Sequence, residues 1–411
     1  MPQITRDGQN MSNSAQVFAH LRIWDGVADG YVDGADAIRI ERGVITALGR
    51  AVEISAGATV RDMHGITAIP GLIDAHVHMV LDPDLRDPLA QTNGDAQTRF
   101  AAMAQRAGEM VRAGITTARD LGGGEWLELE LRDRIARGEI AGPRLLCSGQ
   151  PVTSPGGHCF FWGGEAATLA DAAAVIARQH EHGVDLIKVM ATGGTMTKGS
   201  TPRSAQFDQE TLAAIVADAR QRGYPVAAHC HGTIGIRYAA LAGVNTIEHC
   251  SWVGEAGWGA EYDAELAAEM ARRGVWVSPT VNAGWKRHQG SGSDHEKRLL
   301  GNFAAMRAAG VQFAASTDAG IPNVRHADLA KALPVFGHFA AMSNADVLKT
   351  ATSACARAIG LAGVTGRLSP GFAADVLFVD GDPLADLGCL TAPVDVLARG
   401  ESVGGPSTTA S

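Results

Sequence analysis

The sequence lacks the features that mark nucleic-acid-binding proteins and membrane proteins. Its 411 residues hold 35 Lys and Arg against 44 Asp and Glu, which gives a net charge of −9, and they contain no basic run. Because binding to phosphate backbones needs clustered Lys and Arg, nucleic acid is not expected as a main partner. No window approaches ~18 consecutive apolar residues, so neither a transmembrane helix nor a membrane partner is expected.

Cysteine is also scarce. The chain has six, at positions 147, 159, 230, 250, 355 and 389, too few for a disulfide framework and never in the CxxC spacing of structural zinc sites. Three of them directly follow a histidine, where a thiol would be prone to oxidation if the histidine bound a metal. Residues 1–16 lack the apolar segment of a secretory signal. We therefore expect a protein of the reducing cytoplasm.

The chain does contain two patterns of secondary structure. Its first ~65 residues alternate as short strands with tight turns. From residue 66 onwards strands alternate with helices, and helical periodicity is clear at Ala96–Ala113, Leu169–His182, Asp208–Arg222, Ala264–Arg273 and Asn344–Leu361. The strands predicted between helices are Ala68–Met79, Ile115–Asp120, Arg144–Ser148, Leu186–Met190, Val226–His229, Thr246–His249, Val275–Ser278 and Phe313–Ser316.

Eight strand–helix pairs in series predict an α/β fold, a (β/α)8 TIM-like barrel, over residues 66–365. The β-rich segments 17–65 and 366–400 flank it, so we expect them to meet in one small β-sandwich domain. Residues 1–16 and 401–411 have the composition of disordered tails.

Residues able to bind metal stand at the ends of several predicted strands: His76, His78, Lys188, His229, His249 and Asp318. The carboxyl ends of barrel strands converge on one face, where such enzymes carry their active sites. His76 and His78 are two apart in a strand and so face the same side, as ligands of a zinc-type site would. A partly buried polar pair is the alternative.

Lys188 lies in an apolar strand, where a charged amine is costly. A neutral amine there can react with carbon dioxide to give a carbamate that bridges two cations; a structural ion pair is the alternative. His229 and His249 are one strand–helix unit apart, which predicts adjacent strands, although each alone would fit a core histidine. Asp318 can hold a metal and accept a proton, or instead cap the following helix.

As a set, these segments resemble the amidohydrolase superfamily. Matching stretches include Gly71–His78, Gly114–Asp120, Lys188–Gly194, Ala228–Gly232, Ile247–His249, Ser316–Asp318 and Gly371–Asp375. The resemblance is to the binuclear subgroup, in the branch of Xaa-Pro dipeptidases, Xaa-Arg carboxypeptidase-like enzymes, imidazolonepropionase-related hydrolases and ochratoxin-degrading amidases.

The resemblance implies two divalent metal ions, which we expect to be Zn²⁺. His76, His78 and Asp318 would bind the more buried ion and His229 and His249 the second, with carboxylated Lys188 bridging both. Mononuclear deaminases of this superfamily have a Glu shortly after the histidine that matches His229. Residues 230–233 are Cys-His-Gly-Thr, so deamination is disfavoured.

Other residues are candidates for substrate contact. His158 lies in a Gly-Gly-His segment of the peptidase-like branch, and His231 stands where related dipeptidases often have Tyr. We expect either one to polarise the scissile carbonyl, with a structural role as the alternative. Arg203 is a candidate to bind a carboxylate, or is a solvated loop charge. Loop aromatics predict a pocket for a bulky apolar group: Phe160, Phe161, Trp162, Trp252, Trp258 and Trp285.

The hypothesis is a hydrolase that cleaves the amide bond of a dipeptide or N-acyl amino acid with a bulky or aromatic group. Hydroxide held by the metal pair would attack, and Asp318 would pass its proton to the leaving nitrogen. Alternatives are a small xenobiotic amide, urea, carbamate, ester or lactone. A non-catalytic scaffold is disfavoured because every ligand position is filled. From the resemblance we also expect a homo-oligomer.

Overall fold

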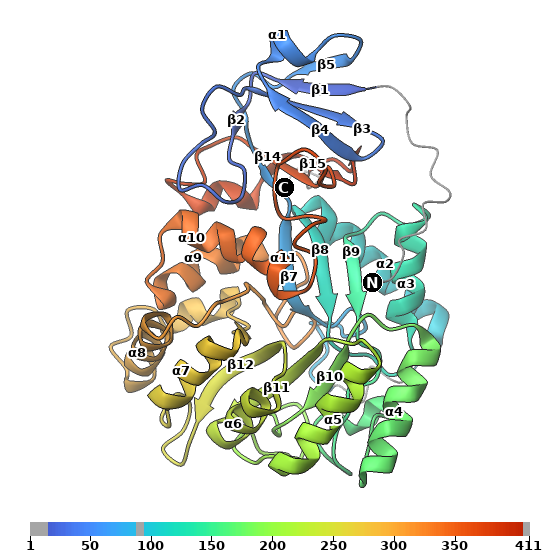
Figure 1. Cartoon of the computed structure of the whole chain (residues 1–411), viewed down its shortest axis with the longest axis vertical. Coiled ribbons are helices and arrows are strands. Elements are labelled where there is room, and N and C mark those ends of the chain that lie inside the picture. The colour runs from blue at the N-terminus through green and yellow to red at the C-terminus, as the bar shows by residue number, and fades with distance from the viewer. Residues whose placement is uncertain (1–14, 88–93, 406–411) are drawn as a thin grey trace.

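The computed structural model describes residues 15–87 and 94–405, with two small sheets at one end of a larger body of strands and helices (Figure 1). The expected tails, 1–16 and 401–411, lie mainly outside the described residues. Gln16 begins a strand, and Glu401–Ser402 form another. None of the described helices combines the length and apolar character needed to cross a bilayer.

Parallel strands form the centre of the larger body. One sheet contains β7 (Leu72–Val77), β8 (Ile115–Asp120) and β9 (Arg144–Cys147). The other contains β10 (Ile187–Met190), β11 (Val226–Gly232), β12 (Thr246–Val253) and β13 (Trp276–Ser278). Isolated parallel bridges join Val152 to Val189, Val277 to Phe313, and Val77 to Ala319, so the pairings run from β7 through β13 and return to β7. The fold is TIM-barrel-like, as predicted.

Helices follow these strands and cover them: α2 (Ala96–Arg112), α3 (Leu127–Ala136), α4 (Leu169–His182), α5 (Gln209–Gln221), α6 (Thr233–Ala242), α7 (Ala264–Arg273) and α8 (Asp294–Ala308). In α4 the Thr168 and Asp171 side chains form a capping box at the start, and Gly183 ends the helix with a φ of 73°. Its buried positions include Ala172, Val175 and Ile176, the spacing of an amphipathic helix. The predicted bounds of α4 and α7 are confirmed.

One predicted helix, Asn344–Leu361, was wrong. The structure divides it into α10 (Asn344–Thr350) and α11 (Ser353–Ala358), after α9 (Leu329–Ala340). The carbonyl oxygen of Thr350 accepts a hydrogen bond from Ala315 N at 2.8 Å, and that of Ala351 accepts from Ile73 N at 2.7 Å. Because these carbonyls bond to the barrel, they are not used within a continuous helix.

The predicted strand Phe313–Ser316 is not a regular strand. Ala314 N donates to the carbonyl of Val277, whereas Ala315 N donates to that of Thr350 in α10. Successive residues therefore bond to different neighbours, and only the bridge at Phe313 remains of a ladder with β13.

The two small sheets are built from both ends of the chain. The first has the order β4 (Val44–Gly49), β3 (Ala37–Glu41), β1 (Gln16–Ala19), β5 (Thr59–Asp62), with α1 (Ala51–Ile54) beside it. The second has the order β16 (Glu401–Ser402), β15 (Pro393–Ala398), β14 (Val376–Val379), β6 (Thr67–Pro70), β2 (Arg22–Ile23). Phe18 of the first stacks on Phe378 of the second at 5.2 Å, inside one hydrophobic cluster.

The predicted strand Ala68–Met79 is in fact two strands in different sheets. β6 pairs with β14 in the small sheet, β7 pairs with β8 in the barrel, and Gly71 separates them. A Cβ at Gly71 would lie 2.2 Å from Thr116 Oγ1, so this crossing leaves no room for a side chain. Gly71 N donates to the carbonyl of Asp375 at 2.9 Å, which ties the crossing to the C-terminal segment.

Candidate metal centre and substrate cavity

The first group of predicted ligands meets at the end of β7. His76 Nε2 lies 3.3 Å from His78 Nε2, and Asp318 Oδ1 lies 3.3 Å and 3.4 Å from these two nitrogens. The two imidazoles share a face because they alternate along the strand. Asp318 takes a positive φ of 62°, and its backbone N–H donates to the His76 carbonyl at 2.9 Å, which fixes the carboxylate beside the histidines.

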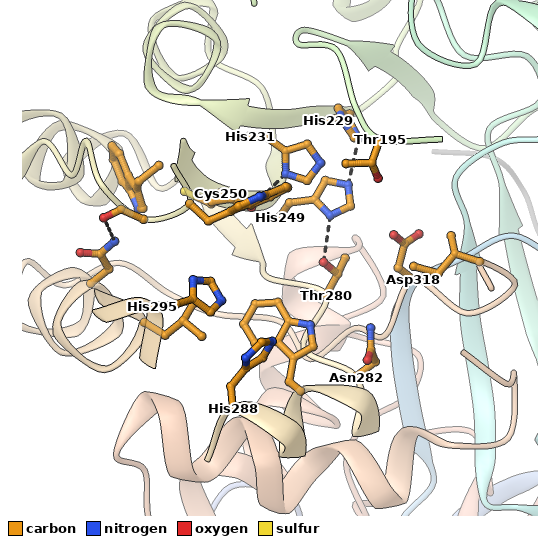
Figure 2. A pocket seen from close by; sticks show the side chains of 18 of the residues that line it. Thr195, His229, His231, His249, Cys250, Thr280, Asn282, His288, His295 and Asp318 are labelled. Carbon is orange, nitrogen blue, oxygen red and sulfur yellow. Dashed lines mark hydrogen bonds between the residues drawn. The ribbon is translucent and has the colours of Figure 1, made fainter. Parts of the chain in front are cut away.

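The second group lies at the ends of β11 and β12. His229 Nδ1 lies 2.9 Å from His249 Nε2. The ring of His231 joins them, with one nitrogen of each of the three imidazoles within 4.8 Å of the others. In Figure 2 the three rings gather on one side of the cavity, and Asp318 points towards it from another.

Groups behind these rings determine which nitrogen carries the proton. His76 Nδ1 faces Glu248 Oε2 at 3.0 Å, and His78 Nδ1 faces the Gly122 carbonyl at 3.0 Å. Carboxylate and carbonyl oxygens only accept hydrogen bonds, so Nδ1 of both rings carries a proton. Both Nε2 atoms then face one another as lone pairs, 3.3 Å apart beside a carboxylate, an arrangement that a metal cation would satisfy.

The outer nitrogens of the second group are also bonded. His229 Nε2 donates to the Gly193 carbonyl at 3.1 Å, which leaves a lone pair on its Nδ1. His249 Nδ1 bonds Thr280 Oγ1 at 2.8 Å, and His231 Nδ1 bonds Ser251 Oγ at 2.9 Å. Each ring is thus held by its outer nitrogen, and the inner nitrogens of His229 and His249 hydrogen-bond to each other at 2.9 Å. The residues fit two metal ions, one for each group.

Glu248 is part of the site, although the sequence argument assigned it no role. It is fully buried and accepts hydrogen bonds from Arg119 Nη2 at 2.8 Å and from His76. Burial favours its neutral form, but Arg119 and His76 outweigh that effect and hold the pKa of Glu248 well below its usual range. It is therefore a carboxylate behind His76, a candidate metal ligand.

Asp74 is a second buried carboxyl behind the site. It accepts from Thr317 Oγ1 at 2.6 Å and from the backbone N–H groups of Thr317 and His76. Burial raises its pKa to about 7 in spite of these bonds. Asp74 joins β7 to the segment that carries Asp318. Both it and Glu248 could have been noticed by the argument used for Lys188, a charged residue inside an apolar strand.

Lys188 lies in β10 and is buried. Burial lowers the pKa of its amine, while Glu248 and Asp318 act in the opposite direction. Its charge in turn helps to lower the pKa of His76 and of His158. The amine is therefore in the electrostatic environment of the proposed ligands, and burial makes its charged form less favourable than in water.

A cavity of about 730 Å³ opens from the second group of imidazoles. Three of the predicted aromatics line it: Trp252, Trp258 and Trp285. Phe161 and Trp162 instead line a separate cavity of about 190 Å³, Trp162 packs on the ring of His78 at 5.2 Å, and Phe160 packs on Phe161. The size is that of a pocket for a small molecule.

Of the three predicted substrate residues, the structure places two in the cavity and one outside it. His158 and His231 both line the cavity, and their rings lie 4.6 Å and 4.5 Å from that of His229. Burial lowers the pKa of His158 to about 4 and that of His231 to about 3, so both are neutral at pH 7. Arg203 does not line the cavity; its side chain is 53% exposed and pairs with Glu255 at 3.3 Å.

The chain is similar to known proteins in sequence and in fold. The model of the amidohydrolase family matches residues 67–404. Ochratoxinase from Aspergillus niger is 29% identical over 360 residues, which cover 79% of this chain and 72% of that protein. Imidazolonepropionase from Cereibacter sphaeroides (strain ATCC 17029 / ATH 2.4.9) is 27% identical over 93% of this chain and 98% of its own. The crystal structure of a Xaa-Pro dipeptidase with bound methionine in the active site superposes with a TM-score of 0.82 and 25% identity, covering 95% of this chain and 100% of that one.

Proposed function

Because the chain belongs to the amidohydrolase family, we propose that it is a two-metal hydrolase that cleaves an amide bond of a small molecule. One observation carries the metal part of this proposal. The Nε2 lone pairs of His76 and His78 face each other at 3.3 Å beside Asp318, and a divalent cation resolves that contact.

In this proposal His76, His78 and Asp318 hold one ion, and His229 and His249 hold the other. Lys188, carboxylated by carbon dioxide, bridges both; the lowered pKa of its buried amine supports that reaction. The ions are proposed to be zinc, which suits imidazole and carboxylate ligands. When bound, they supply an activated water and a Lewis acid for the carbonyl.

The chain's own residues move the proton and orient the carbonyl. Neighbouring imidazoles and Lys188 outweigh burial and hold the pKa of Asp318 below its usual range, so the group is ionised. As a carboxylate beside the site, Asp318 is proposed to accept a proton and pass it to the leaving nitrogen. His158 and His231 are neutral and line the cavity beside the second group, where an imidazole N–H can donate to the carbonyl oxygen of the substrate.

We propose a dipeptide or N-acyl amino acid with a bulky or aromatic group as the substrate. The walls at Trp258 and Trp285 support an aromatic group, and the relatives named ochratoxinase and Xaa-Pro dipeptidase support an amide. The same centre can act on a xenobiotic amide, urea, carbamate, ester or lactone, because attack on the carbonyl does not require a nitrogen leaving group. A homo-oligomer and a cytoplasmic location remain proposals; the unpaired, mostly buried cysteines support a reducing compartment.

Replacing Lys188 tests the proposal. Lys188→Ala should lose most bound metal and most turnover, and short carboxylic acids should restore part of both, because a carboxylate can occupy the bridging position. Metal per chain is measured by plasma mass spectrometry, and turnover by a panel of dipeptides, N-acyl amino acids and aryl amides. Lys286→Ala, an exposed lysine outside the cavity, is the control. Full turnover in Lys188→Ala, or fewer than one metal per active chain, would contradict the proposal.

A further inference from the structure

We propose that the outer end of the cavity, formed by Arg287, His288 and His295, binds an anionic group of the substrate remote from the amide that is cleaved. The inference rests on the proposed function and adds a substrate class to it. The substrate would be an amide that carries a carboxylate beyond an aromatic or bulky apolar part.

The three residues line the same cavity as the metal-binding imidazoles but lie at its other end. Arg287 and His288 belong to the short 3-10 helix η3 (Ala283–His288), and His295 belongs to the first turn of α8. In Figure 2 the labelled rings of His288 and His295 lie away from His229 and Asp318. A molecule that reaches both ends must therefore be extended.

Most N–H donors of the Arg287 guanidinium have no hydrogen-bond partner among the described residues. Its Nη1 donates to the carbonyl of Gly284 at 2.8 Å, and no carboxylate in residues 15–87 or 94–405 forms an ion pair with it. A guanidinium has five N–H donors in a planar fork that matches a carboxylate. This bond within η3 anchors one corner of the guanidinium and leaves most of its donors free for a ligand.

The charge of this end is not compensated. Among the described lining residues the single carboxylate is Asp318, a proposed metal ligand, whereas Arg86 and Arg287 are both cationic. On α8, Glu296 accepts hydrogen bonds from Gly290 N and Gly292 N and approaches His338 at 3.9 Å, and Asp294 forms an ion pair with Lys297. Both carboxylates therefore have other partners. The net field at this end attracts an anion.

The two histidines provide further donors. Their rings lie 4.8 Å apart, edge to face. Burial and neighbouring arginines lower the pKa of both, so that each is a neutral imidazole with one N–H. Trp258 and Trp285 line the same cavity; the Trp258 ring lies 4.9 Å from that of His231, and Trp285 belongs to η3 with Arg287 and His288. The cavity thus combines imidazoles, indole rings and a cationic group.

Arg203 does not compete for this role, because it lies outside the cavity and pairs with Glu255. The carboxylate-binding function that the sequence suggested for Arg203 belongs, in this proposal, to Arg287.

The test compares two ligands that differ only in the remote group: an N-acyl derivative of 4-aminophenylacetic acid, whose carboxylate lies beyond the aromatic ring from the amide, and the same compound as a primary carboxamide. Their dissociation constants are measured by calorimetry on the metal-loaded protein, for wild type, Arg287→Gln and Lys286→Gln. Lys286 precedes Arg287, has the same charge and is likewise exposed, but it does not line the cavity. His295→Asn tests the same site from α8.

We expect Arg287→Gln to weaken binding of the carboxylate about 10- to 100-fold, the range of a charged bidentate hydrogen bond, and to change carboxamide binding little. His295→Asn should weaken the carboxylate less, and Lys286→Gln should match wild type. Equal carboxylate affinity in Arg287→Gln and Lys286→Gln would overturn the inference. Binding does not depend on turnover, so a protein that binds as expected but hydrolyses no amide would refute the proposed function and leave the anion site standing.

Discussion

Imidazoles of the candidate metal centre are oriented by hydrogen bonds from their outer nitrogens to groups behind them. Glu248 lies behind His76, the Gly122 carbonyl behind His78, and the Gly193 carbonyl behind His229. Such partners fix the tautomer and the orientation of the ring. Losing one is therefore expected to weaken metal binding even though every ligand is still present. Glu248 is the partner that a substitution can remove.

Glu248→Gln should therefore lower metal affinity about 10- to 100-fold. A glutamine amide can still face His76, but it no longer neutralises Arg119 or fixes the proton on His76 Nδ1. Metal retained after dialysis against graded chelator concentrations measures the effect. Glu255→Gln, at an exposed surface pair, is the control. Unchanged metal retention in Glu248→Gln would show that Glu248 does not support the site.

His231 is close enough to the second imidazole pair to raise the question whether it binds metal or substrate. We expect His231→Phe to retain two metals per chain and to lose about 100-fold in kcat, the cost of removing one donor to the carbonyl oxygen. Metal content and kcat are measured on the same preparation. Loss of one metal would instead make His231 a ligand.

At this scale the sequence predicts well what recurs at strand ends and poorly what depends on side-chain direction. His76, His78 and Asp318 converge because the ends of parallel strands converge. The position of Arg203 depends on how a loop folds, and no periodicity reports that. Glu248 was overlooked because its role, behind a ligand, becomes visible only when β12 is placed beside His76.

At the scale of elements, β6 and β7 form one stretch of backbone that crosses between two sheets at Gly71. Gly71→Ala should destabilise the protein by about 2–3 kcal/mol, the usual cost of forcing a group into a packed core, because its Cβ would overlap Thr116. Urea unfolding measures the change.

Gly301→Ala in α8 is the matched control. No atom lies within 4 Å of a Cβ built there, and alanine is the better helix former by about 1 kcal/mol. It should leave the protein as stable or slightly more so. Equal stabilities of Gly71→Ala and wild type would mean that the crossing tolerates a side chain.

Helix α3 contains a buried carboxyl group that lowers the free energy of unfolding when it ionises. Glu128 is buried, and its carboxyl oxygens have no hydrogen-bond partner among the described residues. Burial, with the charge of Asp120, raises its pKa to about 8. The folded state therefore holds a proton that the unfolded state releases near pH 4.5, so this contribution to the free energy of unfolding falls as pH rises from about 4.5 to about 8.

Glu128→Gln should remove this dependence and raise the free energy of unfolding at pH 8 by at least ~1 kcal/mol. The measurement is urea unfolding at pH 5 and pH 8. Glu130→Gln, an exposed residue of α3 paired with Arg134, should change stability by less than ~0.5 kcal/mol at both. A loss of stability in Glu128→Gln at pH 8 would show that the carboxylate is stabilised in the fold.

Helices and strands were predicted correctly where the signal lies in neighbouring residues of the sequence. They were missed where hydrogen bonds to distant parts of the fold determine the backbone. The cap at Thr168 and the stop at Gly183 define α4 in the sequence itself. The break at Ala351 and the irregular segment after Phe313 arise because carbonyl and amide groups bond across the barrel. The TIM-like fold was predictable, whereas the β-sandwich and the exact domain boundaries remain predictions.

At the scale of the whole molecule, the site is a concentration of buried imidazoles. Burial lowers the pKa of His76 to about 4, of His158 to about 4 and of His231 to about 3, against about 6.5 when unfolded. Each group favours the folded state above pH 6.5, and that stability is lost as pH falls from 6.5 towards 4.

Metal-free protein should therefore lose stability steeply between pH 6.5 and 4, by up to about 1.4 kcal/mol per pH unit for each such histidine. Urea unfolding of chelated protein at pH 8, 6.5 and 5 measures this. Saturating zinc at pH 8 should raise the midpoint, because only the folded state presents the site. A flat profile from pH 8 to 5 would contradict neutral, buried imidazoles.

The bonds around β7 also have a consequence for biosynthesis. Its last residues pair with Ala319, and Asp74 bonds Thr317, which lies 243 residues further along the chain. While the ribosome is still making the helices between them, His76 and His78 lack the carboxylate that completes their site. In the proposed function, metal loading is therefore expected after synthesis of most of the polypeptide, because a chain arrested before residue 317 would leave those histidines without their acid partner.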